Sequence, residues 1–360
     1  MQEAVTRWFC EKVGNAGSRT HSYGLAAKRA VHAARVQVAS VVSARDDEVI
    51  FTSGATESNN IAILGLAEFG IEKSRYHIVS TAIEHKAVLE PLEALSGRGF
   101  EVTLVKPDST GMVSADSVEE AIRPETLLVS VMHANNETGV RQPIANLASR
   151  LTGHSAFFHV DAAQGFGKDL ASLRSARIDL ISVSSHKIYG PVGVGALVAR
   201  RRGFSRPPLR PLAFGGGQET GVRPGTIPVP LVVGFGLAAQ IAEQDAETRA
   251  ERAEEIRRNA LKAFEPLGIR LHSKLDQTLP HVLNFSVPGV DSEALMVAIK
   301  DIAAVSNGSA CTSQRYTPSH VLTAMGLPED AVSGAVRLSW CHLTPDVDWH
   351  AIASRIDALR

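Results

Sequence analysis

Short apolar runs alternate with longer amphipathic segments between about Glu48 and Arg200. The apolar runs are rich in β-branched residues and too short for ordinary helices, so each one predicts a buried strand. In chain order these runs are "EVIFTSG", "YHIVSTAIEH", "FEVTLVKP", "TLLVSVMHANN", "AFFHVDAAQ", "IDLISVSSHK" and "GALVAR". Because strands that alternate with helical segments build parallel sheets, the pattern predicts a doubly wound, mostly parallel sheet covered by helices.

The pattern changes after about Ala239, where "AAQIAEQDAETRAERAEEIRRNALKA" predicts a charged helical stretch with one solvated face that joins two domains. The residues beyond it predict a smaller α/β unit. Its strands and helices are expected in "HVLNFSV", "DSEALMVAIKD", "SHVLTAMG", "VRLSW" and "DVDWHAIASRI". We therefore expect a large domain over residues 14–245 and a small domain formed by residues 1–13 and 246–360.

The charge balance argues against direct binding to polyanions. Lys+Arg 37 against Asp+Glu 38 gives a net charge of -1 over 360 residues, so direct binding to nucleic acid or to an anionic membrane is not expected. No apolar stretch has the length of a signal peptide core or of a membrane span, which predicts a cytoplasmic protein. Cys10, Cys311 and Cys341 are too scattered for a disulfide framework or a CxxC metal site, so no metal is expected.

Lys187 stands at the carboxyl end of the run "IDLISVSSHK", directly before the chain-breaking "YGP". Ligands of open α/β sheets bind at this edge, and partial desolvation there lowers the pKa of an ammonium group and favours the nucleophilic free amine. For the residue type alone, a lysine that reaches solvent from a loop is the commoner alternative. Lys187 is therefore a candidate that needs support from other residues.

Asp161 ends another apolar run, "FFHVD", and a buried carboxylate needs a cation or several donors beside it. A protonated pyridine nitrogen would supply that cation, and a Lys Schiff base with an Asp on the pyridinium is the recognised pairing for pyridoxal 5′-phosphate (PLP). Gln164 could then reach the ring hydroxyl. An N-cap of the following helix is the alternative role for Asp161.

A phosphate-bearing cofactor needs an anion cradle, and "FTSGATESNN" predicts a strand, a Gly turn and a helix that opens near Thr56 with free N–H groups. The segment is neither a Walker loop nor GxGxxG, which argues against nucleoside phosphates and dinucleotides, and plain helix capping is the alternative. His85 in "TAIEHKAVLE" ends a strand at the same edge and could lie flat on a pyridine ring, although a lone histidine is more often structural.

Eight motifs together resemble those of the cysteine desulfurases, which are fold-type I, class V aminotransferase-like PLP enzymes. In chain order they are "SGATESNN", "EHKAVLEPL", "MHANNETG", "HVDAAQG", "SSHKIYGPVGVGAL", "GGGQETGVRPGT", "NGSACTS" and "VRLS". The resemblance covers nearly the whole chain, and eight ordered motifs outweigh the commoner alternative for Lys187. It implies a fold-type I PLP-dependent transferase, with a large doubly wound sheet domain and a smaller α/β domain.

The resemblance also implies a role for each site residue. Lys187 would bind PLP covalently, Asp161 would pair with the pyridine nitrogen, Gln164 would bond the ring oxygen and His85 would stack on the ring. The phosphate-binding positions match Ala55, Thr56, Ser184, His186 and, from the neighbouring subunit, Thr226. The last match implies a homodimer with shared active sites. Asn136 and Arg337 match the substrate-binding positions, and a planar guanidinium suits a carboxylate.

Cys311 lies among Gly, Ser and Thr in "SNGSACTSQRYTPSH", which predicts a flexible, accessible loop in the small domain. The resemblance implies that its thiolate attacks the sulfur of L-cysteine, keeps it as a persulfide, releases L-alanine and passes the sulfur to an acceptor protein. Cys10 and Cys341 are expected to be small buried residues.

The sequence suggests a pathway and leaves alternatives to the desulfurase reaction. "NAGSRTHSYG" and "GGGQETGVRPGTIPVPL" look most like the desulfurases associated with DNA phosphorothioate modification. Another PLP reaction of the same fold, such as selenocysteine lyase or aminotransferase chemistry, would not need a thiol at Cys311. The chain also starts at the helix after the strand resembling "YLDNNATT" with which family members usually begin, so a PLP-binding dimeric docking partner with little activity is a further alternative.

Overall fold

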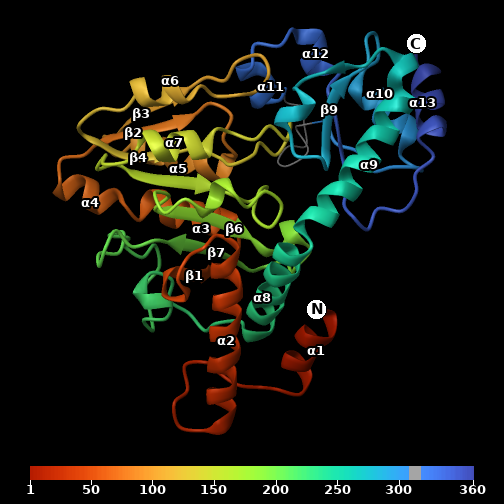
Figure 1. Ribbon diagram of the computed structural model, residues 1–360. Helices are drawn as coiled ribbons and strands as arrows, with labels where there is room; N and C mark the ends of the chain where they lie inside the picture. Colours follow the sequence, from red (N-terminus) through yellow and green to blue (C-terminus); the bar gives the residue numbers. More distant parts are fainter. Residues whose placement is uncertain (308–317) are drawn as a thin grey trace. The chain divides into compact units, whose positions relative to one another are not determined.

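The computed structural model describes residues 1–307 and 318–360 and divides into two compact α/β units (Figure 1). The first unit is formed by Met1–Val105, Ala115–His133 and Pro143–Ala246. The second unit is formed by Lys106–Ser114, Ala134–Gln142 and Glu247–Arg360. Each unit has its own sheet, and the predicted combination of a large, mostly parallel sheet with a smaller α/β unit is confirmed.

The first unit contains a seven-stranded sheet in the order β1-β7-β6-β5-β4-β2-β3. Its strands are β1 (Val49–Thr52), β2 (His77–Thr81), β3 (Glu101–Val105), β4 (Thr126–Ser130), β5 (Phe157–Asp161), β6 (Leu180–Ser184) and β7 (Gly195–Ala199). Strand β7 is antiparallel to both of its neighbours, and the remaining pairs are parallel. All strands except β7 therefore end at one edge of the sheet, as their sequence pattern predicts.

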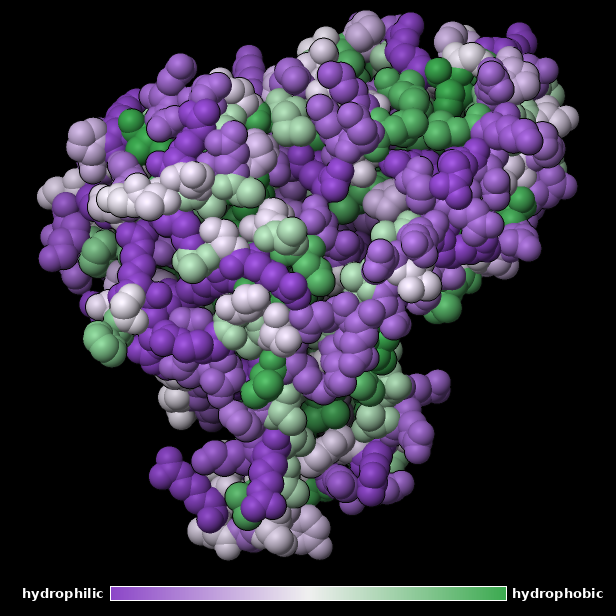
Figure 2. Space-filling model, viewed as in Figure 1, coloured by the Kyte–Doolittle hydropathy of each residue, from purple (hydrophilic) through white to green (hydrophobic). Residues whose placement is uncertain are grey.

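Helices cover this sheet and bury its apolar side chains. The helices of the first unit are α1 (Gln2–Cys10), which packs on another helix, and α2 (Ser22–Val41), α3 (Ala55–Leu64), α4 (Ala67–Glu72), α5 (Lys86–Ser96), α6 (Ala115–Glu120), α7 (Ile144–Arg150) and α8 (Val229–Gln244). Ile61 of α3 and Leu92 of α5 join Ile78 and Leu128 of the sheet in one buried apolar cluster. The face of the molecule in Figure 2 is accordingly mostly hydrophilic, with hydrophobic residues in scattered groups.

Helix α8 packs closely against α2 and α1. A Cβ at Gly236 would lie 2.5 Å from the Cα of Ala34, so only glycine permits this approach of α8 to α2. Val5 of α1 lies against α8 at Gly234 in the same way. Residues 1–13 therefore belong to the first unit. The expectation that they join the small domain is wrong, because α1 packs against α8.

The second unit contains a three-stranded antiparallel sheet in the order β10-β9-β8. Its strands are β8 (Arg270–Leu271), β9 (Val282–Ser286) and β10 (Val336–Ser339). Its helices are α9 (Ala246–Phe264), α10 (Ser292–Ile299), α11 (His320–Ala324), α12 (Glu329–Ser333) and α13 (Trp349–Asp357). Ile256, Ala260 and Phe264 place one side of α9 in the core of this unit.

The helical stretch predicted to join the two domains is two helices, because the backbone leaves helical geometry at Asp245. Helix α8 ends before this residue in the first unit, and α9 follows it. Short 3-10 turns complete the fold at Asp46–Glu48, Ser172–Arg174, Ser185–Ile188, Glu219–Gly221, Glu265–Leu267 and Leu275–Gln277. In the described parts of the chain, no helix combines the length and apolar character that a bilayer span requires.

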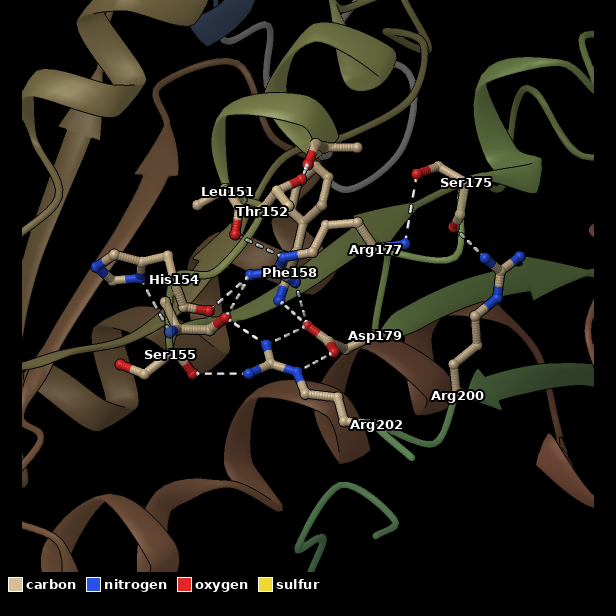
Figure 3. Close-up of polar contacts among 12 residues, drawn as sticks. Leu151, Thr152, His154, Ser155, Phe158, Ser175, Arg177, Asp179, Arg200 and Arg202 are labelled. Atoms are coloured by element: carbon tan, nitrogen blue, oxygen red, sulfur yellow. Dashed lines mark hydrogen bonds and ion pairs between the residues drawn. The ribbon is translucent and has the colours of Figure 1, made fainter. Parts of the chain in front are cut away.

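One buried carboxylate, Asp179, ties together the sheet edge where β5 and β6 begin (Figure 3). It accepts hydrogen bonds from the Phe158 N–H at 2.6 Å, from Arg177 at 2.7 Å and from Arg202 Nε at 2.6 Å. Both guanidinium groups also donate to the Ala156 carbonyl oxygen, at 2.8 and 2.6 Å. The start of β5, the start of β6 and the chain after β7 are therefore fixed by one ionic cluster.

A second buried carboxyl group, that of Glu84, links two chain segments at the opposite edge of the sheet, where β2 and β4 end. Its Oε1 accepts hydrogen bonds from the Thr81 hydroxyl at 2.7 Å and from the Met132 N–H at 2.8 Å. Burial raises the pKa of Glu84 to about 8. These bonds hold the turn after β2 against the chain that leaves β4, and they thereby fix the position of His85, the next residue.

We expect Asp179→Ala to lower the free energy of unfolding by about 3 kcal/mol, because two guanidinium groups lose their carboxylate partner and the buried Phe158 N–H loses its acceptor. Asp179→Asn keeps an acceptor for the Phe158 N–H and should lose less. Urea unfolding of the PLP-loaded proteins measures both. An alanine variant as stable as the wild type would contradict the role of this cluster.

Glu84 should make stability depend on pH. Its folded-state pKa of about 8 lies above the ordinary 4.5, so the folded state holds a proton that the unfolded state releases between these values. Stability of the wild type should therefore fall, relative to Glu84→Gln, as pH rises from about 5 to 8, by up to about 3.5 kcal/mol. Urea unfolding of both proteins at pH 5, 6.5 and 8 tests this. A difference that stays constant over this range would refute it.

Candidate active site

Asp161, the last residue of β5, carries the buried carboxyl group around which the candidate site is built. Its Oδ1 accepts from the Ala163 N–H at 3.0 Å, and its Oδ2 accepts from Asn59 Nδ2 at 2.7 Å. Burial raises the pKa of Asp161, while these two hydrogen bonds and the positive charges of His85 and Lys187 act in the opposite direction. An additional cation next to this carboxylate would stabilise its ionised form.

Asn59 of α3 is a site residue that the sequence analysis missed. Its side chain is 1% exposed, and its Oδ1 is buried without a hydrogen-bond partner among the described residues. Asn59 shares a helix face with the buried Ile63, one turn later. A buried asparagine beside the apolar Ile61, Ala62 and Ile63 of the same helix needs a polar partner, and that was the available signal.

The start of α3 approaches β6 because Gly195 of β7 has no side chain. In the sheet register Gly195 lies beside both Thr52 and Ser184, and a Cβ there would come within 2.6 Å of the Cα of Gly54. Gly54 is the N-cap of α3 and has no side chain with which to cap it. The first N–H groups of this helix therefore face an edge that Ser184 also reaches.

Four expected phosphate-binding residues gather at this edge. Ala55 and Thr56 form the first turn of α3. Ser184 ends β6, and its Oγ lies 2.9 Å from His186 Nδ1. Burial and the neighbouring Lys187 charge lower the pKa of His186. A helix N-terminus with two hydroxyls and an imidazole forms a suitable set of partners for a phosphate group.

His85 and Lys187 come from the turns that follow β2 and β6. Strand β2 ends at Thr81, so His85 is the N-cap of α5 rather than a strand residue, and its Nδ1 accepts from the Ala87 N–H at 3.1 Å. The proton of a neutral His85 ring is then on Nε2. Lys187 lies half-buried in the 3-10 turn directly after β6. Both side chains interact electrostatically with Asp161.

Gln164 and Thr226 are the remaining expected site residues of the first unit. Gln164 is half-buried in the turn after β5. Thr226 is exposed, in a segment that Arg223 ties to α3 through a 3.0 Å bond from its Nε to Glu57. The contact of Thr226 with a neighbouring subunit stays a prediction.

The two expected substrate residues are neighbours in the second unit. Arg337 of β10 donates from Nη1 to the Asn136 carbonyl oxygen at 2.8 Å. Its Nε is buried without a hydrogen-bond partner among the residues that the structure describes. A buried guanidinium edge with an unused donor suits a carboxylate ligand.

The structure describes two of the three cysteines, and these two differ in solvent exposure. Cys311 lies outside the described residues. Cys10 is exposed, since it ends α1, a helix without a buried residue, and Cys341 is half-buried beside the Thr344 hydroxyl. The expectation that Cys10 and Cys341 are buried is therefore wrong.

The residues of the first unit fit PLP. The buried Asp161 carboxylate suits a pyridinium, the Lys187 amine suits the aldehyde, and the start of α3 with Ser184 suits the phosphate. PLP supplies an electron sink that stabilises negative charge at the substrate Cα. Within the described ranges, no cluster of His, Cys, Asp and Glu side chains is arranged to hold a metal ion.

Comparison with known proteins identifies the family. The model of the family described as aminotransferase class-V matches residues 2–348. A protein named cysteine desulfurase IscS, from Vibrio cholerae, is 43% identical over 336 residues, which are 93% of this chain and 82% of that protein.

Solved structures agree with this result. DndA from Streptomyces lividans has a TM-score of 0.85 and 50% sequence identity, over 94% of this chain and 95% of that one. A structure described as SspA in complex with cysteine has a TM-score of 0.81 and 37% identity, over 94% of each chain. The chain therefore belongs to the class V aminotransferase family, among its PLP-dependent cysteine desulfurases.

Proposed function

We propose that this chain converts L-cysteine to L-alanine by transferring the substrate sulfur to Cys311 and then to an acceptor protein. The observation that carries the proposal is the grouping of an amide (Asn59), an amine (Lys187) and an imidazole (His85) around the buried Asp161 at one sheet edge. Such a grouping serves PLP chemistry at an amino-acid Cα. The similarity to cysteine desulfurases supports the choice of substrate.

Each residue of the first unit has a distinct proposed task. Asp161, held by Asn59, keeps a proton on the pyridine nitrogen, and His85 lies on the ring with its Nδ1 engaged by the Ala87 N–H. Lys187 Nζ holds the cofactor and accepts the Cα proton of the bound cysteine. The remaining contacts are Gln164 with the ring oxygen and Ala55, Thr56, Ser184 and His186 with the phosphate.

The proposed tasks of Arg337 and Cys311 concern the substrate itself. The guanidinium of Arg337, beside Asn136, binds the cysteine carboxylate. The Cys311 thiolate attacks the substrate Sγ, so an S–S bond forms as the Cβ–Sγ bond breaks. The electron pair of the broken bond stays with the carbon skeleton, which takes up a proton and leaves as L-alanine, while Cys311 keeps the sulfur as a persulfide.

The acceptor is proposed to belong to DNA phosphorothioate modification. The resemblance of "NAGSRTHSYG" and "GGGQETGVRPGTIPVPL" to desulfurases of that process and the 50% identity to DndA support this assignment. Because the chain has a net charge of -1, we propose that the sulfur passes to a protein that handles the DNA rather than to DNA directly. The proposed form is a cytoplasmic homodimer in which Thr226 contacts the neighbour's phosphate.

We expect Cys311→Ser to abolish persulfide formation, because a serine hydroxyl provides almost no anion at neutral pH and cannot carry sulfane sulfur. PLP content and cysteine binding should stay unchanged. The measurement is alkylation of the protein after incubation with labelled cysteine, with and without reductant. Lys187→Ala serves as the control that loses covalent PLP. Label on Cys10 or Cys341 of the wild type would contradict the assignment.

We expect Arg337→Ala to weaken cysteine binding by about 1.5–3 kcal/mol, roughly 10- to 100-fold, because a charge-assisted contact to the carboxylate is lost. PLP should stay bound, since Arg337 belongs to the second unit and the cofactor residues to the first. Titration of the PLP absorbance with L-cysteine measures the affinity. An unchanged affinity in the alanine variant would exclude this role.

A further inference from the structure

Arg223 and Glu57 form an ion pair at the start of α3, and neither residue has a task in the proposed function. Arg223 Nε donates to Glu57 Oε1 at 3.0 Å, and the two side chains are 26% and 28% exposed. The pair joins the segment between β7 and α8 to the helix whose first N–H groups are expected to hold the PLP phosphate. Charges at that end of the helix affect how strongly a phosphate is held there.

Glu57 places a negative charge at the helix end where the phosphate is expected. It is the third residue of α3, and its Oε2 accepts from the Ser53 N–H at 2.5 Å, so the carboxylate lies at the N-terminal end of the helix. Burial raises the pKa of Glu57, but the hydrogen bonds from Arg223 and Ser53 outweigh burial and lower the pKa below its ordinary value. The carboxylate is therefore ionised at neutral pH, and without compensation it would repel a second anion at the same helix end.

The turn before Arg223 is held in place by another carboxylate, that of the buried Glu219. Glu219 accepts from both Nη atoms of Arg35 in α2, at 2.8 and 2.6 Å, and from the Phe51 N–H of β1 at 2.7 Å. Glu219 and Thr220 have φ angles of 47° and 58°, a left-handed conformation that a β-branched threonine rarely adopts. Such a conformation persists only where surrounding contacts determine it, and the contacts of Glu219 do so here.

The residues on either side of Arg223 have contacts of their own. Val222 packs against the apolar cluster of the first unit. The Gly225 N–H donates to Gln218 Oε1 at 2.9 Å, which closes the loop around Arg223. An arginine whose backbone is fixed on both sides loses less freedom when it forms an ion pair than a flexible surface arginine does. The pair with Glu57 should therefore be stronger than an ordinary surface ion pair.

We propose that Arg223 is a positioning residue for the PLP phosphate, which acts through Glu57 by compensating the charge of its carboxylate. With Arg223 in place, Glu57 can bind the Ser53 N–H without opposing the phosphate, and the N–H groups of Ala55 and Thr56 serve the anion. The inference rests on the proposed binding of the phosphate at this helix end. Loss of Arg223 should weaken the binding of the phosphate and leave the contacts of the pyridine ring unchanged.

The first experiment titrates the full-length wild type and Arg223→Ala with PLP and with pyridoxal, which lacks the phosphate, and follows the absorbance of the bound ligand. Arg223→Ala should bind PLP about 5- to 20-fold more weakly and pyridoxal with less than about 2-fold change, since only the phosphate meets the uncompensated charge. Arg223→Lys keeps the charge and should recover most of the PLP affinity. Arg210→Ala, which removes a guanidinium paired with Glu72 in the same unit, is the matched control.

A second experiment tests whether Arg223 acts through Glu57. Glu57→Gln keeps an oxygen for the Ser53 N–H but carries no charge, so its PLP affinity should equal or exceed that of the wild type. In this background Arg223→Ala should change the PLP affinity by less than about 2-fold, because no charge is left to compensate. Melting temperatures report folding, and Arg223→Gln, which keeps a donor without the charge, replaces the alanine variant if that variant does not fold.

The outcomes separate this inference from the proposed function. An unchanged PLP affinity in Arg223→Ala would overturn the positioning role, and so would an equal loss of affinity for PLP and for pyridoxal. A full loss of PLP affinity on Arg223→Ala in the Glu57→Gln background would also overturn it, because Arg223 would then act without Glu57. A wild type that binds pyridoxal as tightly as PLP would instead refute the proposed phosphate site.

Discussion

The chemistry of the first unit depends on the burial of one carboxylate, Asp161, at the end of a parallel strand. Burial alone would favour the protonated acid, and the ionised form requires donors and positive charge close by. Asn59, the Ala163 N–H, His85 and Lys187 provide them from α3, the turn after β5 and two further turns. A pyridinium beside Asp161, as we propose, would add the positive charge that stabilises the ionised carboxylate.

Buried carboxylates recur in this chain as ties between distant segments. Asp179 holds the edge where β5 and β6 begin, Glu84 holds the turn that leads to His85, and Glu137 holds the start of α11. Each accepts hydrogen bonds from parts of the chain that are far apart in sequence. A carboxyl group suits this task because its oxygens can accept more than one donor, and at Asp179 the charged partners Arg177 and Arg202 strengthen the bonds. Stability and the placement of functional groups therefore share the same interactions.

The chain distributes its chemistry over two units in an interleaved order. The motif "MHANNETG" starts in the first unit with Met132 and His133 and continues into the second with Asn136 and Glu137. The expected cofactor residues belong to the first unit and the expected carboxylate-binding residues to the second. If these roles hold, substitutions should affect PLP binding and cysteine binding separately.

Local sequence determined the strands, most helices and the sheet edge on which Asp161 and Lys187 lie. Hydrophobic periodicity and chain-breaking residues act within a few positions, and parallel strands necessarily end at one edge, so these features follow without knowledge of long-range contacts. The ordered motifs added the family and its cofactor. Only the tertiary structure decided which partner each buried polar group meets: Asn59 with Asp161, Ser319 with Glu137, and α1 with α8. Those choices depend on segments that folding brings together from distant parts of the chain, and no local pattern encodes them.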